Sequence, residues 1–113
     1  MAASNTLHIR NHFTFPITVS VRLDGWNCCD EPTPGQMVGY IQPMASVDLA
    51  FCRKDGHGCN GRQGEFILSI NATMAVALNF DSDGGMAPPA PNGCEAQLAQ
   101  LDGGTYSLIV YSS

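Results

Sequence analysis

Charged residues are scarce in this sequence, and most of those present are acidic. Lys, Arg, Asp and Glu make up 13% of the 113 residues, with five basic against ten acidic side chains and a formal net charge of −5. A protein that binds nucleic acid by neutralising phosphates needs a basic surface, so this balance argues against DNA or RNA as a partner. The low charge and the 44% apolar content also argue against a disordered chain.

Long apolar runs are absent too. No stretch approaches the ~20 apolar residues that a membrane-spanning helix requires. The segment from Met1 to Thr6 lacks the basic and apolar regions of a secretion signal. We therefore expect a cytoplasmic protein, a protein secreted by a route without a recognisable signal peptide, or a chain whose signal has been removed.

Motifs of catalysis are missing. The sequence contains no Gly-x-Ser-x-Gly and no Cys-x-x-Cys, and the histidines His8, His12 and His57 have no spacing typical of a catalytic triad. We expect a binding protein rather than an enzyme.

Short strands separated by turns dominate what is present. Apolar and polar residues alternate with period two along most of the chain, and glycine and proline cluster between the alternating stretches. Cys94–Leu101 also suits a helical turn by propensity, but Asp102-Gly103-Gly104 behind it favours a hairpin. The expected strands are Thr6–Asn11, Pro16–Leu23, Gln36–Ile41, Ser46–Cys52, Glu65–Ile70, Thr73–Phe80, Cys94–Leu101 and Thr105–Tyr111. About eight such strands predict one domain, residues 1–113, folded as a single antiparallel, jelly-roll-like β-sandwich.

Five cysteines are more than an intracellular chain of this size usually carries, which predicts disulfides. All five are disulfide candidates: Cys28, Cys29, Cys52, Cys59 and Cys94. The odd number leaves at least one thiol free or intermolecular, and the adjacent Cys28 and Cys29 are expected to pair elsewhere rather than with each other. The alternative is that some of them are simply small buried apolar residues.

The segment Arg53–Gly64 is the most chemically loaded part of the chain, and we expect it to form part of a ligand-binding surface. It brings basic side chains and glycines into one loop, and the loop residues predicted to touch a ligand are Arg53, Lys54, His57 and Arg62. Trp26 and Tyr40 are added as aromatic contacts. Trp26 is expected in a loop, and a ring in a loop can stack on a sugar or sit at a membrane interface. Alternatively, Trp26 closes one end of the sandwich.

Metal ligands are sparse. Asp81 and Asp83, followed by glycine, resemble the start of a calcium loop, but Asn92 stands where a closing Glu would be needed. Cys52, His57 and Cys59 would supply three zinc ligands at most. We expect no cofactor, with calcium at Asp81 and Asp83 as the remaining candidate and an ordinary acidic turn as the alternative.

One family resemblance emerges from the order of landmarks between Leu7 and Leu68. The residues that carry it are Ile9-Arg10-Asn11, the strand Ile17–Leu23, Trp26, Ile41-Gln42-Pro43, Phe51-Cys52-Arg53 and Gly61-x-x-Gly64-Glu65-Phe66-x-Leu68. In this order they resemble the aegerolysins, small acidic β-sandwich proteins that bind membrane lipids. The likeness covers a little over half the chain, and the Trp/Cys/Pro-rich segment of that family has no counterpart here.

The resemblance implies a protein that binds membrane lipids. The stronger expectation from the same resemblance is a protein that is one half of a toxin pair. Two alternatives come from the residues themselves. A lectin-like module would use Trp26 and the Asp81–Asp83 loop to bind a glycan. A self-assembling structural subunit would pair with copies of itself, or with a partner protein, through exposed edge strands.

Overall fold

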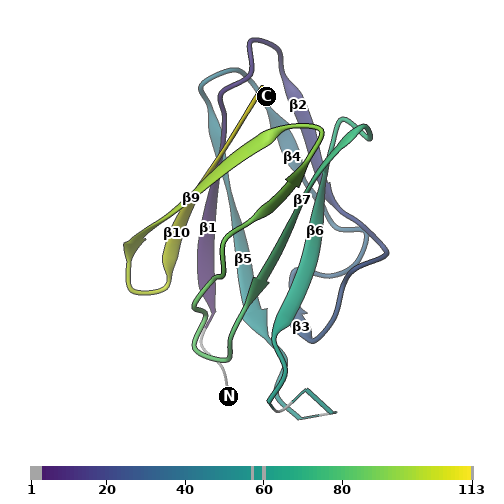
Figure 1. The fold of residues 1–113 in the computed structure, drawn as a ribbon, viewed down its shortest axis with the longest axis vertical. Coiled ribbons are helices and arrows are strands. Elements are labelled where there is room, and N and C mark those ends of the chain that lie inside the picture. The colour runs from purple at the N-terminus through teal and green to yellow at the C-terminus, as the bar shows by residue number, and fades with distance from the viewer. Residues whose placement is uncertain (1–3, 57, 60, 113) are drawn as a thin grey trace.

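The computed structural model describes residues 4–56, 58–59 and 61–112, and over these ranges it consists of β-strands and loops (Figure 1). Ten strands form two five-stranded sheets, one with the order β3-β5-β1-β10-β9 and the other with the order β4-β2-β6-β7-β8. The strands are β1 (Asn5–Asn11), β2 (Ile17–Val21), β3 (Cys29–Glu31), β4 (Met37–Ile41), β5 (Ser46–Arg53), β6 (Gly64–Ile70), β7 (Met74–Phe80), β8 (Ala90–Asn92), β9 (Glu95–Asp102) and β10 (Thr105–Tyr111).

The predicted all-β, sandwich-like arrangement is confirmed, but the predicted count of eight strands is wrong. The two additional strands, β3 and β8, lie in segments predicted to be loops. Each has only three residues, which is too short to show a period-two pattern, and a proline stands beside β3 and inside β8. The segment Cys94–Leu101 is a strand, as predicted, and not a helix.

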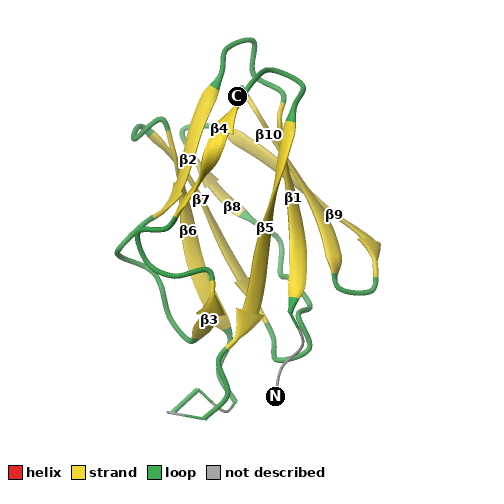
Figure 2. Ribbon diagram, turned by 180° about the vertical axis from the view of Figure 1, so that it is seen from behind, coloured by secondary structure: helices red, strands yellow, loops and turns green. Residues whose placement is uncertain are grey.

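One pairing is parallel, so the expectation of a purely antiparallel sandwich is also wrong. β1 and β10 run in the same direction side by side, with Leu7 opposite Tyr106 and Ile9 opposite Leu108. This pairing joins the two ends of the chain at the centre of the first sheet (Figure 2). The other pairings between strands are antiparallel.

The core lies between the two sheets and comes from the alternation seen in the sequence. In β1, β6 and β10 every second side chain is buried, so each strand turns one face toward the opposite sheet. Three phenylalanines fill the centre: Phe51 and Phe66 both pack edge-on against Phe80. The ring of Phe80 also covers Gly64, where an added Cβ would lie 2.5 Å from the ring.

Two turns form where the sequence indicates them. Asn71 and Ala72 both have positive φ angles, 53° and 60°, and with Thr73, whose amide donates to the Ile70 carbonyl at 3.2 Å, they form a tight link between β6 and β7. Gly103 and Gly104 connect β9 to β10. The expected strand Pro16–Leu23 stops earlier than predicted: β2 ends at Val21, and the Leu23 side chain is 80% exposed instead of packing inward.

Candidate functional site

Two loops meet at one end of the sandwich, and a single buried side chain holds them together. The loops are residues 12–16, between β1 and β2, and residues 42–45, between β4 and β5; both lie at the top of Figure 1. The Asn11 side-chain amide donates hydrogen bonds to the carbonyl oxygens of Phe15 and Ile41, both at 2.9 Å. Its oxygen accepts a hydrogen bond from the Phe13 amide at 2.7 Å. We call this end, Asn11 with the two loops, the Asn11 tip.

Backbone hydrogen bonds complete the connection. The Met44 amide donates to the Asn11 carbonyl at 2.7 Å, and the Asn11 amide donates to the Ala45 carbonyl at 3.0 Å. Met44 itself adopts a positive φ of 67°, which turns the chain sharply between β4 and β5. Because Asn11 is fully buried and every polar group of its side chain and backbone here has a partner, the tip is held in one arrangement before any ligand arrives.

Large apolar side chains stand out from this tip. Phe15 is 40% exposed and Met44 is 56% exposed, one on each loop. Tyr40, 61% exposed, lies on the edge strand β4 directly before Ile41, whose carbonyl oxygen Asn11 binds. The Phe15 ring stacks on Phe13, which is buried, with ring centroids 4.9 Å apart. Exposed apolar side chains on loops of fixed conformation are typical of surfaces that contact lipids or other proteins.

The tip also differs in charge from the rest of this acidic chain. Neither loop contains an Asp or a Glu, although the chain has ten acidic residues. Two residues that can carry positive charge, Arg10 and His12, flank the buried Asn11, and both are exposed. The tip therefore combines apolar side chains with weakly basic surroundings.

The basic residues predicted to bind a ligand lie at the opposite end of the sandwich. Arg53 ends β5 and pairs with Cys29 of β3, whereas Tyr40 lies near the other end, one residue before Ile41 at the end of β4. The structure therefore does not bring Tyr40 together with the 53–62 loop. Lys54 is half-buried and Arg62 is exposed in that loop, and His57 lies outside the described residues.

Arg53 faces into the protein and holds its own loop. It is 7% exposed, and its guanidinium donates to the carbonyl oxygens of Cys59 and Arg62 at 3.1 and 3.0 Å and forms an ion pair with Asp55 at 3.1 Å. A disulfide between Cys28 and Cys59 fastens the same loop to the segment before β3. Both contacts give this end of the molecule a structural framework.

Trp26 is tied to the fold rather than free in a loop. Its ring is half-buried against the core, and its indole N–H donates to the Pro32 carbonyl oxygen at 2.7 Å.

Asp81 and Asp83, the residues predicted to bind calcium, form part of a hydrogen-bonded turn. The Asp81 carboxylate accepts hydrogen bonds from the amides of Asp83 and Gly85, both at 2.9 Å, and Asp83 is exposed. Among the residues that the structure describes, no group of three or more His, Cys, Asp or Glu side chains is arranged to hold a metal ion.

Of the five disulfide candidates, the structure joins Cys28 to Cys59. Cys29, Cys52 and Cys94 lie outside this bond and are buried. The Cys29 sulfur lies 3.4 Å from the carbonyl oxygens of Asn27 and Glu65, and burial raises the pKa of this thiol to about 12. A thiol in this state is a packing residue and a poor nucleophile at neutral pH.

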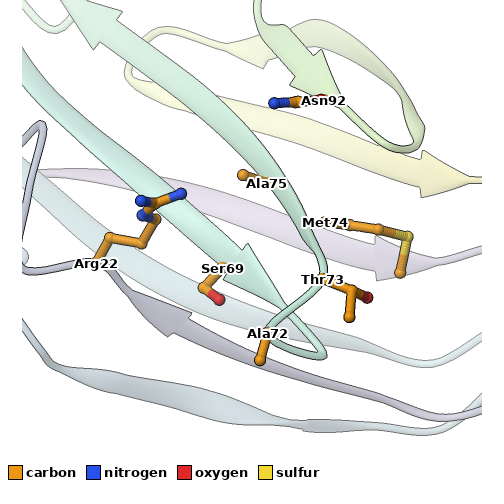
Figure 3. A pocket seen from close by; sticks show the side chains of 7 residues that line it. All are labelled: Arg22, Ser69, Ala72, Thr73, Met74, Ala75 and Asn92. Carbon is orange, nitrogen blue, oxygen red and sulfur yellow. The ribbon is translucent and has the colours of Figure 1, made fainter.

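The second sheet carries two shallow hollows on its outer face. One, of about 340 Å³, lies across β6, β7 and β8 and is lined by Arg22, Ser69, Thr73, Asn92 and three further residues (Figure 3). Arg22 is engaged by Asp24 through a two-point ion pair. The other hollow, of about 260 Å³, lies between Gly25 and Pro88. The first hollow offers polar groups but no aromatic ring in its lining on which a sugar could stack.

The residues that define the Asn11 tip were only partly visible in the sequence. Phe15 is an aromatic residue beside a proline, whereas nothing in the sequence indicates that Asn11 and Met44 share a site. The local feature that the two loops share in the sequence is a proline in each, Pro16 and Pro43.

Searches of protein-family models and of curated proteins find no match to this chain. Within the described residues, no helix is long and apolar enough to cross a membrane.

Proposed function

We propose that the protein is a non-enzymatic lipid-binding protein that docks on the surface of a bilayer through the Asn11 tip. The observation that carries this proposal is the pairing of exposed Phe15 and Met44 on two loops locked together by Asn11. A preorganised tip loses little conformational entropy when its side chains enter the interface. Membrane lipid is also the ligand class implied by the aegerolysin resemblance.

Zwitterionic lipid is the preferred surface. The chain as a whole has a formal net charge of −5, so a strongly anionic bilayer repels it. The tip itself lacks acidic residues, which allows its apolar side chains to enter the headgroup region of a neutral bilayer. In such a docked arrangement the exposed Tyr40 would suit the region between the headgroups and water, where an aromatic ring with a hydroxyl group is favourable.

Co-sedimentation with vesicles tests the proposal. The wild type, Phe15→Ala/Met44→Ala and Leu23→Ala are compared on phosphatidylcholine, phosphatidylcholine–phosphatidylserine and sphingomyelin–cholesterol vesicles. Leu23→Ala is the matched control, because Leu23 is a highly exposed apolar residue outside the tip. Each truncated tip residue removes roughly 1–2 kcal/mol of apolar transfer, so the double variant should bind at least tenfold more weakly.

Binding to zwitterionic vesicles that survives Leu23→Ala and is lost in the double variant supports the proposal. Equal loss in both variants, or no pelleting of the wild type on any of the three compositions, contradicts it. The lectin-like alternative has a separate readout: a glycan array would report binding that does not depend on Phe15 or Met44.

A further inference from the structure

Among the edge strands that the structure describes, β9 is the longest and the least protected against pairing with another chain. Two sheets have four outer strands, and three of them are blunted in ways typical of natural edges. β3 and β8 have three residues each, and β8 contains Pro91. β4 has five residues and an irregular register with β2, and its Gly39 lies against Val47 of the other sheet.

β9 has one irregularity, a register shift opposite Thr105 and Tyr106 near its C-terminal end, and its pairing with β10 is regular from Glu95 to Gln100. It is eight residues long, and between Glu95 and Asp102 it reads Ala-Gln-Leu-Ala-Gln-Leu, with no charge and no proline. In the described sheet β10 is its single hydrogen-bonded neighbour. Figures 1 and 2 both show β9 at the outer margin of the molecule. Its Leu101 side chain is among the most exposed large apolar side chains.

The hydrogen bonds of β10 determine which groups of β9 point outward. The amides of Thr6 and His12 in and after β1 donate to the carbonyl oxygens of Gly104 and Val110, so the even-numbered residues of β10 face β1. Backbone groups alternate along a strand, so the odd-numbered residues Ser107, Ile109 and Tyr111 face β9. Their register partners are Ala99, Gln97 and Glu95. The N–H and C=O groups of the residues between them, Ala96, Leu98 and Gln100, therefore point away from the sheet.

This outward set is complementary to itself. When two copies of β9 run antiparallel about a two-fold axis at Leu98, Leu98 faces Leu98 of the second copy, and Ala96 faces Gln100. All three outward residues then form hydrogen-bonded pairs, and a pairing centred one residue away, at Gln97 or Ala99, leaves one of the three unpaired.

Charge favours the same register. Centring at Leu98 places Glu95 opposite Leu101 of the second copy. A strand offset of one residue would instead place Glu95 opposite Asp102 at two positions, where like charges destabilise a cross-strand pair.

We propose that β9 is the contact surface of a symmetric homodimer, in which two copies pair antiparallel at Leu98 and their first sheets join into one continuous sheet. The occupant is a second copy of this chain, because the outward groups and the charges both fit a two-fold arrangement. The contact lies away from the Asn11 tip and is independent of the proposed lipid binding.

Cysteine cross-linking tests the register. In a hydrogen-bonded antiparallel pair, opposing Cα atoms lie ~5.5 Å apart, within the range that a disulfide spans. Leu98→Cys should therefore give a dimer on non-reducing gels after mild oxidation. Ala96→Cys is the matched control, because Ala96 would lie about 13 Å from its copy, four strand residues away.

Sedimentation equilibrium tests the dimer without an added thiol. The wild type should approach twice the 12.0 kDa chain mass as concentration rises. Ala96→Pro removes an outward N–H and leaves the β10 hydrogen bonds in place, so it should remain monomeric with unchanged circular dichroism. A monomeric wild type, a dimer that survives Ala96→Pro, or equal cross-linking of Leu98→Cys and Ala96→Cys would overturn the proposal. The cross-linking result stands even if Ala96→Pro fails to fold.

Discussion

The side-chain amide of Asn11 donates a hydrogen bond to the carbonyl oxygen of Ile41 at 2.9 Å, and this bond ties the end of β1 to the end of β4, strands of opposite sheets. The bond is buried, so it is not exchanged with water, and the same amide group also holds Phe15. One short polar side chain thereby fixes the spacing of the two sheets at the end where the apolar residues are exposed.

Asn11→Asp should destabilise the protein strongly. The substitution keeps the shape but replaces the donor by a carboxylate oxygen that faces two carbonyl oxygens, and a buried unpaired charge of this kind costs roughly 2–4 kcal/mol of unfolding free energy. Urea denaturation of the wild type and the variant measures this loss of unfolding free energy. Asn71→Asp is the matched control, because Asn71 uses its side-chain oxygen to accept from the Thr18 amide and keeps that acceptor as Asp. Equal stability of the two variants would contradict the role given to Asn11.

Removing the Cys28–Cys59 disulfide should also lower stability. The bond closes a sequence separation of 31 residues, and a cross-link of this size stabilises by roughly 2–4 kcal/mol, mainly by restricting the unfolded chain. Cys28→Ser/Cys59→Ser should therefore unfold at lower denaturant concentration than the wild type. Reductant should lower the wild-type midpoint to that of the double variant and leave the variant itself unchanged. A wild-type midpoint that does not respond to complete reduction would contradict this prediction.

The basic loop and the Asn11 tip can be separated by mutation. Arg53→Met breaks one buried and two half-buried contacts and should lower the unfolding free energy by roughly 2–3 kcal/mol, since hydrogen bonds to charged groups are among the stronger ones. Lys54→Ala/Arg62→Ala should leave both stability and vesicle binding close to wild type, because surface charges contribute little on a neutral bilayer. Vesicle co-sedimentation at equal folded concentration is the measurement. Loss of binding in the Lys54/Arg62 variant would instead favour the basic loop as the lipid contact.

Several features of the fold could be predicted from the sequence because they depend on local patterning. Most of the expected strands bury one face, so period-two alternation marks them, as in β6, whereas β9 has no fully buried side chain. The parallel pairing of β1 with β10 has no local signal, because it joins segments about a hundred residues apart. The Asn11 tip could not be predicted from the sequence for the same reason: its polar contacts reach Ile41, which is 30 residues away. Arg53 was misjudged because a basic residue in a glycine-rich loop gives no sign that nearby carbonyl groups will surround it.

Alkaline pH should destabilise the protein through Cys29. Burial raises the pKa of this thiol from its ordinary value of 9.0 to about 12. Between these values the unfolded chain has lost the proton and the folded chain has kept it, so the stabilisation is complete below pH 9 and is lost as the pH rises toward 12. The unfolding free energy should fall by at most about 1.4 kcal/mol per pH unit from this group.

The comparison that isolates this effect is between the wild type and Cys29→Ala. Denaturation curves recorded after short incubations between about pH 8 and about pH 10.5 should show a steeper fall for the wild type, since the substitution removes the titrating group. Parallel slopes for the two proteins would show that Cys29 ionises alike in the folded and unfolded chains.

The two proposals make a joint prediction about vesicles. The Asn11 tip lies at the Asn11 end of β1, and β10 runs parallel to β1, so the tip projects from the end of the sheet to which β9 belongs. Antiparallel pairing of β9 reverses the second copy, and the two tips of the dimer then point in opposite directions. Such a dimer should bridge two vesicles, and light scattering of phosphatidylcholine vesicles should rise when wild-type protein is added.

The wild type, Ala96→Pro and Phe15→Ala/Met44→Ala together distinguish the contribution of the Asn11 tip from that of the β9 contact. Ala96→Pro should pellet with vesicles without clustering them, because a monomer has one tip, and Phe15→Ala/Met44→Ala should do neither. Clustering by Ala96→Pro at the wild-type level would refute the β9 dimer as the bridging species and leave lipid binding by the tip intact. Clustering by the Phe15/Met44 variant would refute the tip instead, because the dimer contact is unchanged in that protein. Each result therefore identifies the end or the edge of the sandwich that makes the contact.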